Sequence, residues 1–307
     1  MKLQQMRYLC TVVDSNFNIT EAAAALYTSQ PGVSKQIRVL EQELGVEILV
    51  RAGNRIIGTT EAGTEIVAAA RRVLMDARQL EQVAEEFTHR DSGRLVVATT
   101  HLHARFPLLP VITAFAKKYA SVQMRLLQCP PEEIEARVVA GEADIGVTTG
   151  SDTLASQCVA LDAYPLHRCL IAPRGHPVLK IRRPALKDIA RYPLIMYDPH
   201  FSSGKSVQDA FDRAGIAPNV VLSAIDADVI KAYVAGKLGI AVLQSLAYDA
   251  RLDREIGAVN VDHLFPGTHT KLILNRAKYM RQYTFDFIHM LVPAWTQSKV
   301  KAALAAG

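Results

Sequence analysis

The residues from Thr28 to Lys35 bring together side chains that can recognise nucleic acid bases. They read Thr-Ser-Gln-Pro-Gly-Val-Ser-Lys. A glutamine side chain pairs with adenine through two hydrogen bonds, and a lysine reaches the acceptors of guanine. Proline is tolerated in the first turn of a helix, where its missing N–H leaves no hydrogen bond unmade. Pro31 therefore predicts a new helix that begins at Ser29–Gln30 and carries these polar side chains in its first turns.

Three helices and a hairpin are expected to hold this helix start in place. Apolar residues recur at helical spacing over residues 3–13, and a second helix runs from its N-cap Thr20 to Tyr27. The third helix continues from Ser29 and ends at Gly45. Two short apolar runs beyond Gly45 flank a Gly-Asn pair and predict a hairpin. The sequence therefore predicts a winged helix-turn-helix over residues 1–59.

The second helix of a helix-turn-helix meets base edges with its N-terminal residues, and phosphate contacts fix its position. Gln30 and Lys35 are expected to read bases, and Arg38 to contact phosphate. The full predicted DNA-contacting set is Thr28, Ser29, Gln30, Pro31, Ser34, Lys35, Arg38, Arg51 and Arg55. The net charge of +5 is compatible with double-stranded DNA but does not identify it. The alternative is a small helical domain that only packs.

A long helix capped by Thr60 is expected to follow. Two sets of residues recur every seven positions along it: Ile66, Val73, Leu80 and Phe87, and Ala70, Ala77 and Ala84. Such a heptad pattern forms an apolar stripe, here called the seam, and the small alanines in it let a partner helix approach closely. We therefore predict a linker and dimerisation helix over residues 60–91. The alternative is a single amphipathic helix that lies on its own domain.

Residues 92–307 alternate between apolar runs typical of buried strands and amphipathic helices. This alternation indicates an α/β fold with parallel sheets. Because the pattern starts again beyond Tyr164, we predict two Rossmann-like lobes with a cleft between them. Lobe I is expected over residues 92–162 and 267–307, and lobe II over residues 163–266.

Hydroxyl side chains are expected at the cleft. They end strands or precede a helix, and they are Thr99, Thr100, Thr148, Thr149, Ser202 and Ser203. Ligands of α/β sheets bind beyond the carboxyl ends of strands, and helix N-termini attract anions. The sequence therefore predicts a small anion between the lobes.

Other polar groups near the cleft leave alternatives open. His101 and His103 either strengthen anion binding at low pH or are simply exposed to solvent. Two imidazoles two residues apart diverge on a helix, so no metal site is predicted. Asp226 and Asp228 form a carboxylate pair, or one of them caps the following helix, which is the expected role. Gly204-Lys205-Ser206 lacks the earlier glycine of a P-loop.

The four cysteines show no CxxC spacing, which indicates buried thiols rather than disulfides or zinc ligands. The first residues form no apolar leader, and no apolar window of about 18 residues exists. No nucleophile–base pair indicates an enzyme. A cytoplasmic protein without membrane contact is expected.

The stretch "EAAAALYTSQPGVSKQIRVLEQELGVEILVR", followed by "TEAG", resembles the N-terminal signature of the LysR-type transcriptional regulators. The resemblance extends along the chain, because that family joins this domain through a linker helix to a two-lobed effector domain similar to periplasmic binding proteins. It implies a DNA-binding regulator that forms a dimer or tetramer. The competing class is a cytoplasmic anion-binding protein or enzyme whose cleft is its whole function.

The stretches "MKLQQMRYL", "VATTHLHARFPLLP", "DADVIKAYV" and "YTFDFI" are similar to the CysB/Cbl branch, which regulates sulfur assimilation. This similarity implies a small effector such as sulfate, adenosine phosphosulfate or an acetylserine, held by Thr100, Thr149 and Ser202, and no other cofactor. A regulator of a non-sulfur pathway is the alternative within the family.

The chain departs from the branch at three positions near the cleft. Leu102 and His103 replace its usual Thr-Gln pair, and Leu166 stands where tryptophan is common. These changes predict a ligand that differs in size or charge. Whether the effector activates or represses, and which promoters are bound, stay open.

Overall fold

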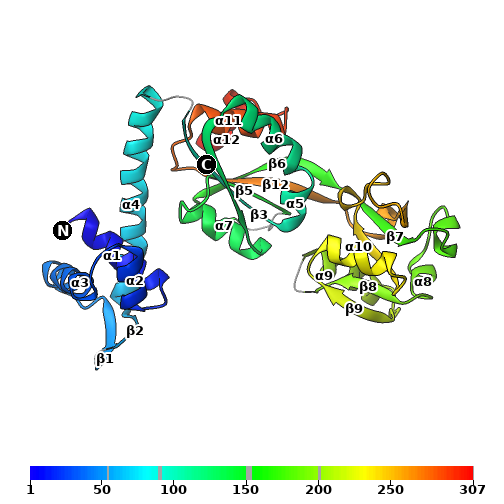
Figure 1. The fold of residues 1–307 in the computed structure, drawn as a ribbon, viewed down its shortest axis with the longest axis horizontal. Helices are drawn as coiled ribbons and strands as arrows, with labels where there is room; N and C mark the ends of the chain where they lie inside the picture. The colour runs from blue at the N-terminus through cyan, green and yellow to red at the C-terminus, as the bar shows by residue number, and fades with distance from the viewer. Residues whose placement is uncertain (54, 89–91, 150–153, 200–201, 307) are drawn as a thin grey trace. The chain divides into compact units, whose positions relative to one another are not determined.

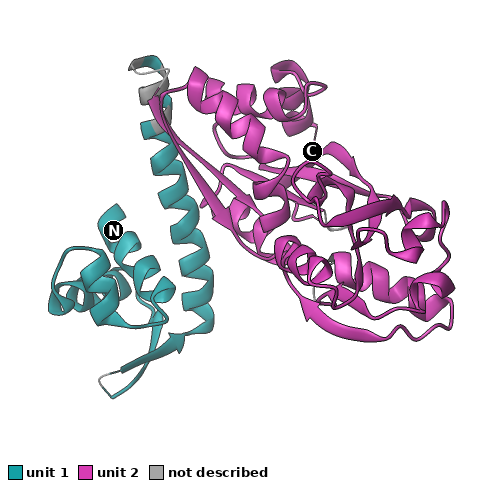
Figure 2. Ribbon diagram, turned by 45° about the vertical axis from the view of Figure 1, so that its right-hand side comes forward, with its two compact units in different colours: residues 1–88 teal, residues 89–307 magenta. Residues whose placement is uncertain are grey.

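The computed structural model describes residues 1–53, 55–88, 92–149, 154–199 and 202–306. The chain divides into two compact units, Met1–Thr88 and His89–Gly307 (Figure 2). Within the described ranges, no helix combines the length and the apolar character needed to cross a membrane.

The first unit is a winged helix-turn-helix with a long helix attached, as predicted. Its elements are α1 (Leu3–Asp14), α2 (Ile19–Ala25), α3 (Gln30–Leu44), β1 (Leu49–Ala52), β2 (Arg55–Thr59) and α4 (Glu61–Thr88). Leu9, Ile37 and Leu40 are buried at the centre of its core. The two strands pair as an antiparallel hairpin.

Local capping explains where these helices begin and end. The Ser29 hydroxyl accepts a hydrogen bond from the Gly32 N–H at 3.3 Å, and Gly45 ends α3 with a φ of 71°. The prediction that Thr20 caps α2 is wrong. The Asn18 side chain accepts from the N–H groups of Thr20 (3.1 Å) and Glu21 (3.2 Å), so the helix begins earlier. Asparagine is among the strongest N-cap residues, and it precedes Thr20 in the chain.

The start of α4 is fixed tightly to the hairpin domain. The Thr60 hydroxyl accepts from the Gly63 N–H at 2.8 Å and donates to the Glu47 carbonyl oxygen at 2.7 Å. A Cβ atom at Gly63 would lie 2.0 Å from the Ile48 carbonyl oxygen, so only glycine allows this approach. About two turns further, Ala70 packs against Met6 and Cys10 of α1.

The second unit contains two five-stranded sheets, each at the centre of one lobe (Figure 1). The first has the order β4-β3-β5-β12-β6, with bounds Ser121–Gln128, Ser92–Thr99, Ile145–Thr149, Thr268–Asn275 and Cys158–Leu166. The second has the order β11-β7-β10-β8-β9, with bounds Ile256–Asn260, Arg168–Pro173, Ile240–Gln244, Leu194–Tyr197 and Val220–Ala224.

Helices cover both faces of each sheet. Lobe I carries α5 (His101–Arg105), α6 (Leu108–Lys118), α7 (Pro131–Val139), α11 (Gln282–Leu291) and α12 (Gln297–Ala305). Lobe II carries α8 (Leu186–Ile189), α9 (Ser202–Arg213), α10 (Ala227–Ala235) and short 3-10 helices at Pro177–Lys180, Ser245–Ala247 and Asp262–Leu264. Alternate residues of β3 explain the layers, because Leu95 packs towards Phe115 and Phe287 whereas Val96 packs towards Ile134 of α7.

Three expectations for this unit need correction. The sheets are mixed rather than parallel, because β12 runs antiparallel to β5 and β6, and β7 runs antiparallel to β10 and β11. Lobe I extends to residue 166 rather than 162, because β6 pairs with β12 along its whole length. Ser202 and Ser203 lie within α9 rather than before it. The strand directions and the end of lobe I depend on which distant strands pair, and the periodicity of a sequence does not show this.

Candidate functional site

The first unit presents a polar surface at the start of α3. Ser29, Gln30, Pro31, Lys35 and Arg38 are exposed, and Thr28 and Ser34 are half-buried. Gln30, Ser34 and Arg38 line a groove of about 390 Å³ whose opposite wall is the hairpin, with Arg51 and Arg55. In the described part of the chain, Lys35, Arg38 and Arg55 have no ion-pair partner, which leaves their charges available for phosphate.

Arg51 differs from the other predicted DNA contacts because it is bound to Glu41. Its Nη2 lies 2.7 Å from the Glu41 Oε2, and the Glu41 Oε1 accepts from the N–H groups of Ile48 (2.9 Å) and Leu49 (3.1 Å). Burial alone would raise the pKa of Glu41, but the Arg51 hydrogen bonds and the two backbone N–H groups together lower it. Arg51 therefore anchors the hairpin to α3. The sequence analysis assigned no role to Glu41, because its partners on the hairpin are set by tertiary contact.

The heptad seam of α4 changes character along its length. Ile66 and Ala70 pack on the helix-turn-helix core, whereas Leu80 and Phe87 are 74% and 77% exposed. Val73 is also exposed, Ala84 is exposed, and Ala77 is half-buried. The alternative of a helix lying on its own domain therefore fits its first turns only.

A pocket of about 340 Å³ lies between the two lobes of the second unit. Its lobe I wall includes Thr100, His101, Leu102, Gln128, Cys129 and Thr149, and its lobe II wall includes Tyr197, Ser203, Ile225 and Asp226. The pocket thus brings together five predicted ligand residues: Thr100, His101, Leu102, Thr149 and Ser203. In the described part of the structure, the Thr100 side chain makes no capping bond to α5, which leaves its hydroxyl available to a ligand.

Other predicted ligand residues do not line this pocket. Thr99 and Thr148 are buried, and the Thr99 hydroxyl donates to the Val147 carbonyl oxygen at 3.1 Å. Leu166 is also buried and lies outside the lining residues. The side chain of Ser202 lies outside the described part of the structure.

The expectation of a titrating His103 is corrected. His103 is only 1% exposed, and its Nδ1 lies 2.9 Å from the Tyr164 hydroxyl. Burial lowers the pKa of His103 to about 4, so the imidazole is neutral at pH 7. His103 therefore supports the wall of lobe I and carries no charge for an anion.

His101 faces two carboxylates of lobe II. Its Nε2 lies 3.0 Å from the Asp226 Oδ2 and 3.5 Å from the Asp228 Oδ2. Asp226 also caps α10, as predicted, because its Oδ1 accepts from the N–H groups of Asp228 (2.7 Å) and Val229 (3.2 Å). Both roles suggested for this pair of acids are therefore present.

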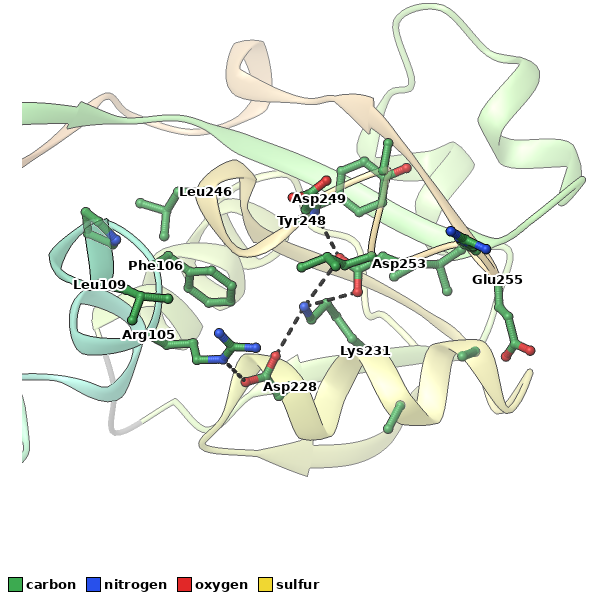
Figure 3. A pocket seen from close by; sticks show the side chains of 17 residues that line it. Arg105, Phe106, Leu109, Asp228, Lys231, Leu246, Tyr248, Asp249, Asp253 and Glu255 are labelled. Atoms are coloured by element: carbon green, nitrogen blue, oxygen red, sulfur yellow. Dashed lines mark hydrogen bonds and ion pairs between the residues drawn. The ribbon is translucent and has the colours of Figure 1, made fainter. Parts of the chain in front are cut away.

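Further charges extend this contact into an inter-lobe ion-pair network of His101, Arg105, Asp226, Asp228, Lys231 and Asp253. Figure 3 shows the part of this network formed by Arg105, Asp228, Lys231 and Asp253. Arg105 Nε lies 3.5 Å from the Asp228 Oδ2, and Lys231 Nζ lies 3.1 Å from the Asp228 Oδ1. Lys231 Nζ also lies 3.2 Å from an Asp253 oxygen. His101, Asp226 and Asp228 are of the right types for a divalent cation, but Arg105 and Lys231 already hold both Asp228 oxygens. We therefore interpret these three residues as a contact between the lobes rather than as a metal site.

An open hollow of about 1030 Å³ lies beside the inter-lobe ion-pair network (Figure 3). Phe106 and Leu109 of lobe I and Tyr248 of lobe II are among its lining residues. Leu102 and Phe106 also pack against the apolar core of lobe II around Ile195 and Ile230. The lobes thus meet through apolar side chains as well as ion pairs.

Known proteins resemble the chain along its whole length. Residues 88–296 match the LysR substrate binding domain, and residues 3–64 match the bacterial regulatory helix-turn-helix protein, lysR family. The chain is 40% identical over 304 residues to the HTH-type transcriptional regulator SsuR of Burkholderia cenocepacia, with 99% of each chain covered. It is 39% identical over 303 residues to the HTH-type transcriptional regulator CysB of Haemophilus influenzae, covering 99% of this chain and 94% of that relative.

A solved structure resembles the second unit. It is the cofactor-binding domain of the Cbl transcriptional regulator, which is 33% identical, with a TM-score of 0.65. The match covers 70% of this chain and 95% of that one.

Proposed function

Because the chain belongs to the LysR family of bacterial helix-turn-helix regulators, we propose that it controls genes of sulfur metabolism in response to a small sulfur-related anion bound in the inter-lobe pocket. The chain is a DNA-binding transcriptional regulator rather than an enzyme, as are the family and its full-length relatives. The competing class of an anion-binding enzyme is thereby set aside.

The sulfur assignment is supported by the relatives that match along nearly the whole chain, SsuR, CysB and Cbl. The last two names define the branch whose motifs the sequence resembles, and that branch regulates sulfur assimilation. A solved relative is described as having a cofactor-binding domain, and it aligns with the unit that holds the inter-lobe pocket.

The observation that carries the effector proposal is the composition of the inter-lobe pocket. Hydroxyl groups of Thr100 and Thr149 from lobe I face the first turn of α9, where Ser203 lies, from lobe II. Hydroxyls and helix N-terminal N–H groups are the donors that small oxyanions accept from. A ligand that contacts both walls binds the closed arrangement of the lobes more tightly than an open one, and it shifts the population accordingly.

The remaining parts of the proposal concern assembly and DNA. We infer that α4 pairs with α4 of a second copy through Val73, Leu80 and Phe87, which are exposed on one seam. The proposed assembly is a dimer or tetramer in the cytoplasm. Gln30 and Lys35 are the proposed base-reading residues, and Arg38 and Arg55 the proposed phosphate contacts.

A thermal-stability panel on the full chain tests the effector proposal. The panel is sulfate, thiosulfate, adenosine phosphosulfate, O-acetylserine and N-acetylserine. A ligand bound only by the folded state raises the melting temperature by mass action. We expect at least one sulfur-pathway compound to do so, and Thr100→Val to abolish the shift.

The matched control is Thr113→Val, which alters an exposed threonine of α6 away from the pocket and should keep the full shift. If no compound in the panel stabilises the chain, the sulfur assignment is wrong. The DNA-binding assignment would stand, because it depends on the family and not on the ligand.

A further inference from the structure

Arg168 is a buried cation at the point where the chain enters lobe II. It is the first residue of β7 and only 3% exposed. Over the described ranges, no carboxylate forms an ion pair with its guanidinium. The nearby Asp262 is engaged elsewhere, since its Oδ2 pairs with His167 at 2.7 Å and its Oδ1 accepts from the Arg168 backbone N–H.

The guanidinium of Arg168 has few partners for a buried charge. Its Nη1 donates to the Ser203 carbonyl oxygen at 3.4 Å, and its Cζ lies 5.2 Å from the centre of the Phe265 ring. Its Nε has no hydrogen-bond partner among the residues described. Burial lowers the pKa of Arg168 to about 10, so the side chain remains charged at pH 7. A buried, unpaired charge is costly, which makes its retention a sign of function.

A second buried polar atom lies on the adjacent strand. Gln244 pairs with Arg168 across β10 and β7, so the two side chains emerge on the same face of the sheet. Gln244 is 1% exposed, and its Oε1 has no hydrogen-bond partner within the described structure. A donor and an acceptor thus lie unpaired at the edge of lobe II where β8 and β10 end.

The first turn of α9 lies between Arg168 and the inter-lobe pocket. Ser203 both accepts from Arg168 and lines the pocket. A Cβ atom at Gly204 would lie 2.5 Å from the Tyr197 carbonyl oxygen and 2.3 Å from that of Asp198, so glycine lets this turn sit directly on the end of β8. The twelve-residue helix therefore directs its N-terminal N–H groups to the same place that Arg168 supports.

The described lining of the inter-lobe pocket contains no lysine or arginine, and it includes the carboxylate of Asp226. His101 pairs with that carboxylate and is not free to act as a counter-charge. The hydroxyls and helix N–H groups of the pocket carry no full positive charge, and Arg168, which contacts Ser203, is a cation placed directly behind this wall.

We propose that Arg168 is a specificity-determining residue, which restricts the pocket to ligands with a full negative charge placed at the first turn of α9. Arg168 acts on the ligand through its charge and through the Ser203 carbonyl group that it holds. The class of effector is a compact oxyanion, and uncharged molecules of the same shape are excluded. This inference rests on the proposed function, because it assumes that an anionic effector occupies the pocket.

The test is calorimetric titration of the full chain with sulfate, thiosulfate and dimethyl sulfone, an uncharged analogue of sulfate. We expect an anion to bind and dimethyl sulfone not to bind. Arg168→Gln, which keeps hydrogen-bonding capacity but removes the charge, should weaken anion binding roughly tenfold to hundredfold. Arg168→Lys should retain most of the affinity. Arg174→Gln is the matched control, because it makes the same change at an exposed arginine just beyond the other end of β7.

The outcomes separate the two proposals. Equal anion affinity in the unaltered chain and folded Arg168→Gln would overturn the role of Arg168 and leave the proposed function intact. If neither sulfate nor thiosulfate binds the unaltered chain, the inference about Arg168 is overturned, whereas the effector proposal still stands or falls with the other compounds of the panel. If Arg168→Gln does not fold, two other results test the inference. Binding of dimethyl sulfone to the unaltered chain would contradict it. A complete loss of anion binding in folded Arg168→Lys would contradict it as well.

Discussion

At the scale of single residues, two buried charged side chains have hydrogen-bond partners that indicate different roles. Glu41 and Arg168 are both nearly inaccessible, yet their surroundings differ. Glu41 has Arg51 and two backbone N–H groups as partners. Arg168 has one carbonyl oxygen and an aromatic ring. The fully satisfied group stabilises the fold, whereas the unsatisfied one is suited to a ligand.

Glu41→Gln tests the stabilising role at this scale. Loss of the charge should lower the free energy of unfolding by roughly 1–3 kcal/mol, because hydrogen bonds to a charged group are lost. Because the folded-state pKa of Glu41 is lowered, its contribution is present above the ordinary value of 4.5 and disappears as the pH falls further. Denaturant unfolding at pH 7 and near pH 3 measures both effects.

The control for this experiment is Glu47→Gln, an exposed acid close to the same hairpin. It should leave the unfolding free energy almost unchanged. If Glu41→Gln and the control behave alike at pH 7, the Glu41–Arg51 pair contributes nothing to the hairpin, and Arg51 would again be a candidate for DNA contact.

At the scale of elements, α4 has two functions along one helix. Its first turns belong to the helix-turn-helix core, through Ile66 and Ala70. Its later turns expose Leu80 and Phe87, large apolar side chains seven residues apart. Apolar residues that repeat every seven positions favour pairing with a second helix.

Leu80→Glu tests this division. A charge at the seam should separate the subunits or convert a tetramer to smaller species, because carboxylates from two copies would be buried together. Sedimentation velocity over a concentration series measures the mass. Arg78→Glu places the same charge on an exposed, off-seam position and should preserve the assembly. An unchanged mass for Leu80→Glu would mean that α4 is not the dimer contact.

At the scale of the whole effector unit, the two lobes are held by apolar packing and by the inter-lobe ion-pair network. Leu102 and Phe106 give the apolar part, and Asp228 is the centre of the ionic part. Since Asp228 is 39% exposed, the ionic part contributes little stability at ordinary salt. Its importance is in setting how readily the lobes separate.

Asp228→Asn should therefore leave global unfolding nearly unchanged and increase local opening. The loss is at most about 1 kcal/mol, which corresponds to amide exchange up to roughly fivefold faster in α5 and α10. Hydrogen exchange read by mass spectrometry measures it. Asp209→Asn, an exposed acid on α9, is the control. Unchanged exchange in α5 would show that the network does not hold the lobes together.

The sequence predicted those features that depend on residues close together in the chain. Pro31, the Ser29 cap and Gly45 set the recognition helix without reference to distant residues. The position of His103 could not be predicted in this way, because its partner Tyr164 lies 61 residues away and the packing around both buries the imidazole. The antiparallel strands and the partners of Asp228 were missed for the same reason. A pocket lies at the strand and helix ends where the sequence predicts the ligand, but the charges behind its wall were not predicted.

The contact between Gly63 and Ile48 has a mechanical consequence. The Ile48 carbonyl oxygen would lie only 2.0 Å from a Cβ atom at Gly63, and the Thr60 hydroxyl is hydrogen-bonded to both Glu47 and Gly63. These contacts leave no room for a hinge where α4 meets the hairpin. The helix has 28 residues, which corresponds to a rod about 42 Å long. A helix joined rigidly to the hairpin turns together with it. We therefore expect a rotation of the distant turns of α4 to change the angle of the hairpin.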